Sequence, residues 1–87
     1  MKVVLTIGGS DSCSGAGIQA DLKTFAAHGL YGISTVTAVT AQSPSRITAT
    51  HIIPAEIITT QIDTVFDDIA ITGVKTCLLY TSPSPRD

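Results

Sequence analysis

Apolar and β-branched residues recur along the chain in two spacings, and the first of these predicts strands. Residues 3–7, VVLTI, are apolar or β-branched without interruption, which is typical of a buried strand. We expect Gly8 and Gly9 to end it. Residues 33–41, ISTVTAVTA, alternate β-branched with small residues and predict a second strand, which the proline-containing stretch 42–45 terminates. Residues 48–53 predict a short third strand, and residues 71–76 the beginning of a fourth.

The second spacing is helical and occurs twice. Short polar side chains at residues 10–14 favour a turn, so a helix should begin near Gly15 and end at a cap at Gly29. Its sheet-facing stripe is Ile18, Leu22, Phe25 and Ala26, and the opposite stripe carries Asp21 and Thr24. A second helix should start at Pro54 and run to about residue 68, with Ile58, Ile62, Val65 and Ile69 on one face. The predicted order β-α-β-β-α-β is the opening portion of a larger α/β sheet.

Composition narrows the class of protein. The chain has 87 residues, enough for one domain at most, and its 44% hydrophobic content and mean hydropathy of +0.38 fit a parallel sheet covered on both faces. A net charge of −2 without a basic cluster argues against a nucleic-acid partner. The sequence contains neither an apolar run long enough to cross a membrane nor a signal peptide, so we expect a cytoplasmic protein. Cys13 and Cys77 lack the spacing of a zinc site, and no metal site is expected.

The last segment, residues 77–87 with the sequence CLLYTSPSPRD, departs from this pattern. Its composition alone is typical of a linker or a disordered terminus. Every position also matches the in-frame translation of a transposase-type sequencing-library adapter. We therefore expect residues 77–87 not to be native and the genuine domain to cover residues 1–76; a natural proline-containing tail is the alternative.

Candidate chemistry gathers around residues 8–24. Residues 15–20 satisfy the dinucleotide pattern G-x-G-x-x-A, but the second predicted strand ends without the acidic residue that would bind a ribose. Asp11 and Asp21 could act together as acid and base or as magnesium ligands. From the pattern alone we favour the alternative, a turn residue and a solvated helix position. Gln42 ends a strand with one acceptor and two donors, which suits the edge of a small heterocycle, although it could equally be an ordinary loop residue.

Three segments, LTIGGSDSCSGAGIQADLKTFAAHGLYG, TAVTAQ and VKT, closely resemble the amino-terminal part of the bacterial hydroxymethylpyrimidine/phosphomethylpyrimidine kinases of thiamine biosynthesis. The resemblance runs over residues 1–76 without a gap. It implies an α/β fold, a ribokinase-like three-layer sandwich of which only the amino-terminal β-α-β-β-α-β portion is present. The family continues with Gly-Met after the lysine-threonine pair, whereas Cys77 and Leu78 stand here.

The resemblance also implies an activity. The parent protein would transfer the γ-phosphoryl group of ATP, with Mg²⁺, to 4-amino-5-hydroxymethyl-2-methylpyrimidine and then to its monophosphate. Five residues match the family's substrate pocket. By the resemblance, Gln42 binds the pyrimidine, Asp21 on the helix lines the same pocket, and the backbone of Gly9 closes on the ring. Ala16 and Gly17 keep bulky side chains away from the substrate. A pyridoxal kinase of the same superfamily is the alternative, with a dinucleotide-binding oxidoreductase a distant third.

In this family the catalytic residue and the ATP and Mg²⁺ sites come from the carboxyl-terminal half. We therefore expect no catalytic residue and no kinase activity in the 87-residue chain, and a homodimeric parent that binds neither nucleic acid nor membranes. One position departs from the family pattern, because many members carry glycine where Ser14 stands. Serine would be strained there if the position requires a positive φ.

Overall fold

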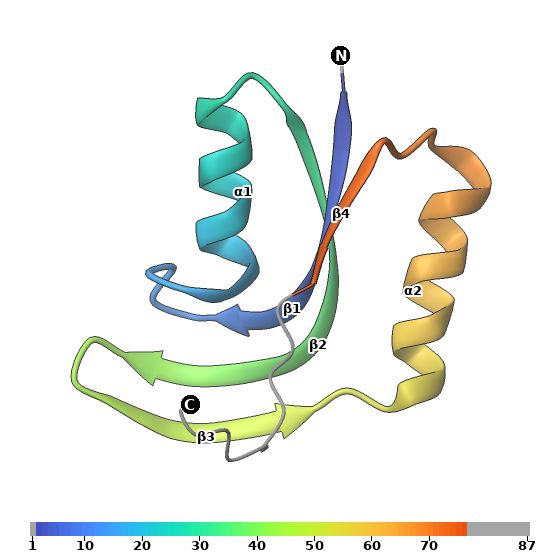
Figure 1. The fold of residues 1–87 in the computed structure, drawn as a ribbon. Helices are drawn as coiled ribbons and strands as arrows, with labels where there is room; N and C mark the ends of the chain where they lie inside the picture. Colours follow the sequence, from blue (N-terminus) through green and yellow to red (C-terminus); the bar gives the residue numbers. More distant parts are fainter. Residues whose placement is uncertain (1, 77–87) are drawn as a thin grey trace, which may run out of the picture.

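Residues 2–76 of the computed structural model form a four-stranded sheet with α1 and α2 on opposite sides of it (Figure 1). The strands are β1 (Val3–Asp11), β2 (Tyr31–Ser43), β3 (Arg46–Ile52) and β4 (Gly73–Thr76), and the helices are α1 (Gly17–Ala27) and α2 (Ala55–Asp68). Their order across the sheet is β3-β2-β1-β4, with β1 parallel to β2 and β4, and β2 antiparallel to β3. The predicted element order is thus confirmed. The expectations about residues 77–87 lie outside the described residues.

Strand β1 continues past the pair of glycines that we expected to end it, so that prediction is wrong. Its pairing with β2 runs on to Asp11, opposite Thr40. The register shifts at the glycines, where Gly8 pairs with Val36 but Gly9 pairs with Ala38. Glycine inside a strand often marks such an irregularity or a close backbone approach, and both apply here. The carboxyl end of β1 therefore extends alongside β2 before the chain turns.

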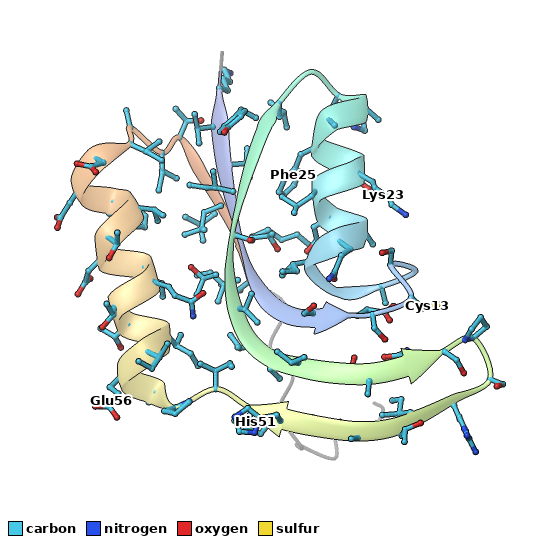
Figure 2. All side chains as sticks on the ribbon, turned by 180° about the vertical axis from the view of Figure 1, so that it is seen from behind. Cys13, Lys23, Phe25, His51 and Glu56 are labelled. Atoms are coloured by element: carbon cyan, nitrogen blue, oxygen red, sulfur yellow. The ribbon has the colours of Figure 1, made fainter. Side chains whose placement is uncertain are left out.

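Helix α1 packs three of the four predicted stripe residues, Ile18, Leu22 and Phe25, on the sheet, whereas Ala26 is exposed. Ile18 and Phe25 are buried, and Figure 2 shows Phe25 directed toward the strands while Lys23 points away from them. The helix lies close to β2, since a Cβ at Gly32 would come within 2.7 Å of a Leu22 methyl carbon. Gly29 was predicted as the cap; the C-cap residue is His28, and Gly29 directly follows it with φ of 74°, the left-handed conformation in which helices commonly end.

Helix α2 covers the other side of the sheet more loosely. Pro54 precedes its first turn as predicted, and its apolar stripe is half-buried rather than buried. Strand β3 pairs with β2 from Ala38 onward, so the backbone of Val36 lies beyond that ladder. The Gln61 side chain bonds there instead: the Val36 N–H donates to Gln61 Oε1 at 3.0 Å, and Gln61 Nε2 donates to the Val36 carbonyl at 2.9 Å. Gln61 thereby attaches α2 to β2.

Among residues 2–76, neither helix is long and apolar enough to cross a membrane.

Candidate functional site

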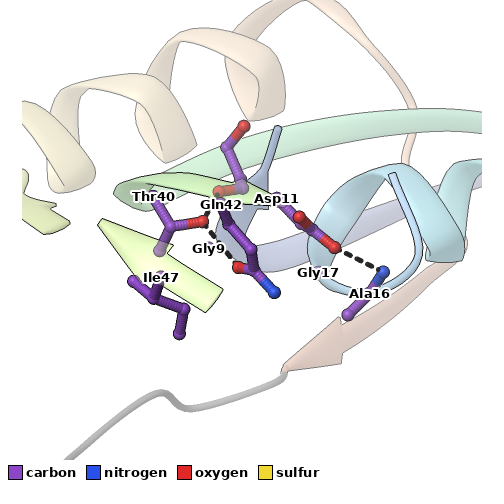
Figure 3. Close-up of a pocket in the computed structure, with 8 residues that line it drawn as sticks. Gly9, Asp11, Ala16, Gly17, Thr40, Gln42 and Ile47 are labelled. Atoms are coloured by element: carbon purple, nitrogen blue, oxygen red, sulfur yellow. Dashed lines mark hydrogen bonds between the residues drawn. The ribbon is translucent and has the colours of Figure 1, made fainter. Parts of the chain in front are cut away.

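A cavity of about 250 Å³ opens where the carboxyl ends of the parallel strands β1 and β2 meet (Figure 3). The start of α1 forms one side of it and the β2–β3 hairpin another. In open α/β sheets this is the edge at which ligands bind, because the loops leave room and backbone groups there are accessible. The lining residues are Gly9, Ser10, Asp11, Ala16, Gly17, Thr40, Gln42 and Ile47.

The structure brings four of the five predicted substrate-binding residues together in this lining, namely Gly9, Ala16, Gly17 and Gln42. Asp21, the fifth, is not among the lining residues. The sequence did not point to Thr40 or Ile47. Thr40 lies within a run of similar strand residues, and Ile47 falls outside the predicted third strand, which was expected to begin one residue later.

Gly9 and Gly17 form the tightest part of the cavity wall. Gly17 begins α1 with φ of 64°, and a Cβ built on it would lie 2.4 Å from the Gly9 carbonyl oxygen. Any side chain would therefore collide with backbone, which cannot rotate away. Glycine at position 17 allows α1 to start directly against the end of β1.

Asp11 organises the loop between β1 and α1. Its side chain is buried, with 5% of its surface exposed, and accepts hydrogen bonds from the backbone N–H groups of Cys13 at 2.8 Å and Ala16 at 2.9 Å. These bonds hold the loop away from helical geometry, which explains why α1 begins at Gly17 rather than near Gly15. The Asp11 carboxylate thus lies immediately before the helix, and its negative charge there argues against the phosphate contact of a dinucleotide site.

Ser14 lies in the same loop with φ of 64°. This is the left-handed region, which costs a residue with a Cβ more than it costs glycine. The strain anticipated for serine at this position is therefore present.

Asp21 is buried beneath α1, so the expectation of a solvated helix position is wrong. It is 9% exposed, accepts a hydrogen bond from Thr6 Oγ1 at 2.6 Å, and pairs with Lys75 of β4. Thr6 and Lys75 are neighbours across the β1–β4 ladder. Burial raises the pKa of Asp21, but the hydrogen bonds from Lys75 and Thr6 and the lysine charge outweigh it, so the net pKa lies below its ordinary value. The carboxylate ties α1 to the two strands.

Gln42 is held at both its backbone and its side chain. The Ser12 hydroxyl bridges its backbone, accepting from Gln42 N–H at 2.7 Å and donating to the Gln42 carbonyl at 2.6 Å. Thr40 Oγ1 lies 3.0 Å from Gln42 Oε1 (Figure 3). A side-chain amide fixed in this way reads hydrogen-bonding groups of a ligand with little ordering cost.

Ile47 faces Gln42 because of an irregularity in β3. Ala41 pairs with Ala49, but Gln42 pairs with Ile47, so Thr48 is the extra residue between them. Ile47 is 60% exposed and supplies an apolar edge beside the amide. A flat, partly apolar ring suits such a wall.

The described residues do not fit a nucleotide or metal site. Within residues 2–76, His, Cys, Asp and Glu side chains form no group of three that could hold a metal ion. The carboxylates of Asp11 and Asp21 are engaged with separate partners, and the Asp11 carboxylate lies directly before α1, bonded to the N–H groups of Cys13 and Ala16. The side chains described for residues 2–76 are therefore not arranged to hold ATP phosphates or Mg²⁺.

Comparison with known proteins gives consistent results. The profile of the family described as phosphomethylpyrimidine kinase matches residues 11–84. A hydroxymethylpyrimidine/phosphomethylpyrimidine kinase of Rhizobium meliloti is 53% identical over 73 residues, 84% of this chain and 27% of that protein. The chain thus spans about a quarter of that relative's length.

Solved structures resemble the fold over nearly all of the chain. The phosphomethylpyrimidine kinase of Clostridium difficile 630 superimposes with a TM-score of 0.88 at 48% identity, covering 93% of this chain and 35% of that one. A pyridoxal kinase of Bacillus subtilis, solved as an ADP complex, gives a TM-score of 0.83 at 42% identity, covering 93% and 32%.

Proposed function

This chain belongs to the phosphomethylpyrimidine kinase family, and we propose that residues 1–76 form the substrate-binding wall of a kinase of thiamine biosynthesis. The complete protein would phosphorylate 4-amino-5-hydroxymethyl-2-methylpyrimidine and then its monophosphate. Within this portion the residues bind and orient the ring and exclude water from it. Gln42 would form hydrogen bonds to the ring. Gly9, Ala16 and Gly17 have small or no side chains, so the ring could approach the backbone closely.

The observation that carries this proposal is the chemistry of the cavity lining. Gln42 contributes a neutral amide, Ile47 an apolar edge, and the glycines a wall without side chains. The carboxylate of Asp11 is turned to loop amides rather than left for a ligand. A small neutral heterocycle with donors and acceptors on its edge matches this set, because its polar groups find partners while its faces stay dry.

Asp21 acts at a distance from the ring in this proposal. We retain it as a predicted substrate-side residue, with its role exercised through the position of α1. Its bonds to Thr6 and Lys75 fix the helix whose first residue, Gly17, lines the cavity.

Phosphoryl transfer itself needs groups that stabilise negative charge spreading over the phosphate. We propose that ATP and Mg²⁺ are bound by parts of the complete protein outside residues 1–76, and that residues 77–87 are not native. The 87-residue chain alone would then show no turnover, which an ADP-release assay of that chain tests. We also propose that the complete protein works in the cytoplasm as a homodimer.

Pyridoxal phosphorylation is the second candidate. It is supported by the similarity to pyridoxal kinases, including a Staphylococcus aureus pyridoxal kinase solved with pyridoxal at 36% identity. Pyridoxal is also a small substituted heterocycle of comparable size. The two activities differ in the ring edge that Gln42 would meet.

The test is ADP release by the complete gene product with each substrate. We expect a kcat/KM for the aminopyrimidine at least tenfold above that for pyridoxal, the discrimination that one well-matched polar contact supplies. Greater efficiency with pyridoxal, or no turnover of either pyrimidine, would overturn the proposal.

A further inference from the structure

Thr40 makes two contacts that its single hydroxyl proton cannot both serve. Its Oγ1 lies 2.9 Å from the Ser10 carbonyl oxygen and 3.0 Å from Gln42 Oε1. A backbone carbonyl accepts and does not donate, and the same holds for an amide oxygen. If the Thr40 hydroxyl donates its proton to one of these oxygens, its own oxygen faces the other acceptor oxygen with no hydrogen between them.

Turning the Gln42 amide by half a turn resolves this conflict. The two ends of the amide are alike in size, so the hydrogen-bond network decides which end faces Thr40. With Nε2 toward Thr40, its N–H donates to Oγ1, and the Thr40 proton goes to the Ser10 carbonyl. Both contacts are then hydrogen bonds, whereas the opposite orientation gives one bond and one repulsive contact.

We propose that Thr40 is a positioning residue that turns the carbonyl oxygen of Gln42 toward the ligand and so selects rings carrying an N–H donor. Figure 3 shows the end of the Gln42 amide opposite Thr40 pointing toward the side of the cavity formed by Gly17 and Ala16. With the oxygen at that end, the cavity favours an exocyclic amino group over a carbonyl oxygen at the same ring position. This inference rests on the proposed pyrimidine-binding function and specifies its selectivity.

Ser12 makes this orientation effective by fixing the backbone from which the amide extends. Its hydroxyl bonds to both the N–H and the carbonyl of Gln42, across thirty residues of sequence. Because this backbone is fixed, the remaining freedom of the amide lies in the Gln42 side-chain torsions, and the contact with the Thr40 hydroxyl limits it. Selectivity then depends on a hydroxyl that does not itself have to touch the ligand.

The test measures binding of the aminopyrimidine and of its analogue with an oxo group in place of the amino group, by calorimetry without ATP. The complete gene product is compared with Thr40→Val, which removes the hydroxyl at nearly constant shape, and Thr40→Ser, which keeps it. Thr40→Ala serves if the valine variant fails to fold. The control is Thr50→Val on β3, the exposed neighbour of Thr40 across the ladder and outside the cavity lining.

We expect Thr40→Val to reduce the preference for the amino compound about tenfold, because the released amide can present either end. Thr40→Ser should restore the preference, and Thr50→Val should leave it unchanged. In kinetics, the loss should appear in KM for the amino compound with kcat within about twofold, since the residue acts on ring binding.

A variant cycle shows whether Thr40 acts through Gln42. In a Gln42→Leu background, Thr40→Val should change amino-compound affinity by less than about twofold, since no amide remains to be oriented. An unchanged preference in Thr40→Val, or an equal loss in the Gln42→Leu background, would overturn the inference. If the unsubstituted protein binds and prefers the amino compound but never phosphorylates it, the proposed function fails while the orientation of Gln42 stands.

Discussion

Replacement of Gly17 by alanine tests the close approach between the start of α1 and the end of β1. Two separate features of the structure make a methyl group at position 17 destabilising. Gly17 has φ of 64°, and its added Cβ would lie 2.4 Å from the Gly9 carbonyl oxygen and 3.3 Å from the Asp11 nitrogen. The first reason is local strain, and the second is a collision with the backbone of β1 on the cavity wall.

The two contributions can be estimated separately. Alanine in a left-handed conformation costs about 1 kcal/mol relative to glycine. Forcing an extra methyl group against packed backbone costs about 2 kcal/mol more, because β1 or the whole start of α1 has to move. We therefore expect Gly17→Ala to lower the free energy of unfolding by about 3 kcal/mol.

Gly29→Ala is the matched control. Gly29 has nearly the same backbone conformation, with φ of 74°, but a Cβ there meets no atom within 4 Å. It should therefore show the strain alone, about 1 kcal/mol. Urea unfolding of the complete gene product and both variants gives the two differences directly.

Ligand affinity gives a second readout, because Gly17 lines the cavity and Gly29 does not. Gly17→Ala should weaken aminopyrimidine binding more than tenfold under conditions where both variants are folded, with Gly29→Ala unchanged. Equal losses of stability in the two variants would refute the close-approach argument, since they share the strain and differ in the collision.

Three further predictions concern the elements around the cavity. Ser14→Gly should raise the free energy of unfolding by about 0.5–1 kcal/mol, because it relieves the left-handed strain at that position; no rise in melting temperature would contradict this. Because the pKa of Asp21 is lowered in the folded protein, its pairing with Lys75 stabilises the fold above the unfolded pKa and is lost as pH falls through the folded value. Asp21→Asn should therefore flatten the loss of stability below about pH 4, and an unaltered acid limb in urea titrations would exclude this role. Gln61→Leu should lower the free energy of unfolding by about 2 kcal/mol, since the Val36 N–H and carbonyl lose their partner. Hydrogen exchange at the Val36 amide should then become faster, and unchanged protection of that amide would contradict the prediction.

The strands and helices follow largely from the spacing of apolar residues. The stripe on α2 places Ile58 and Val65 toward the sheet, and Gly29 ends α1 through its positive φ. These are local signals, so they can be read from neighbouring residues. The end of β1 could not be predicted from neighbouring residues, because glycines such as Gly8 and Gly9 usually end a strand. Here the pairing partner supplied by β2 and the approach of α1 keep them in the sheet.

In the candidate site, too, some residues could be predicted from local sequence and others depend on contacts with distant segments. Gln42 stood out because an amide at the end of a strand has evident chemistry, and the family resemblance pointed to Gly9 and Gly17. Ile47 reaches the cavity through the irregular pairing of β2 and β3, which sequence periodicity does not specify, and Thr40 could not be told apart from the other threonines of its strand. Asp21 was misplaced because a charged residue on a helix is usually solvated, and its partner lies on β4, far along the chain.

We propose above all that the cavity at the ends of β1 and β2 binds the aminopyrimidine ring. The most direct measurement is calorimetric binding of 4-amino-5-hydroxymethyl-2-methylpyrimidine to the complete gene product, without ATP, for the unsubstituted protein, Gln42→Leu and Thr50→Val. We predict that Gln42→Leu weakens binding at least tenfold and that Thr50→Val leaves it unchanged. Equal affinity of the Gln42→Leu variant and the unsubstituted protein would contradict the claim.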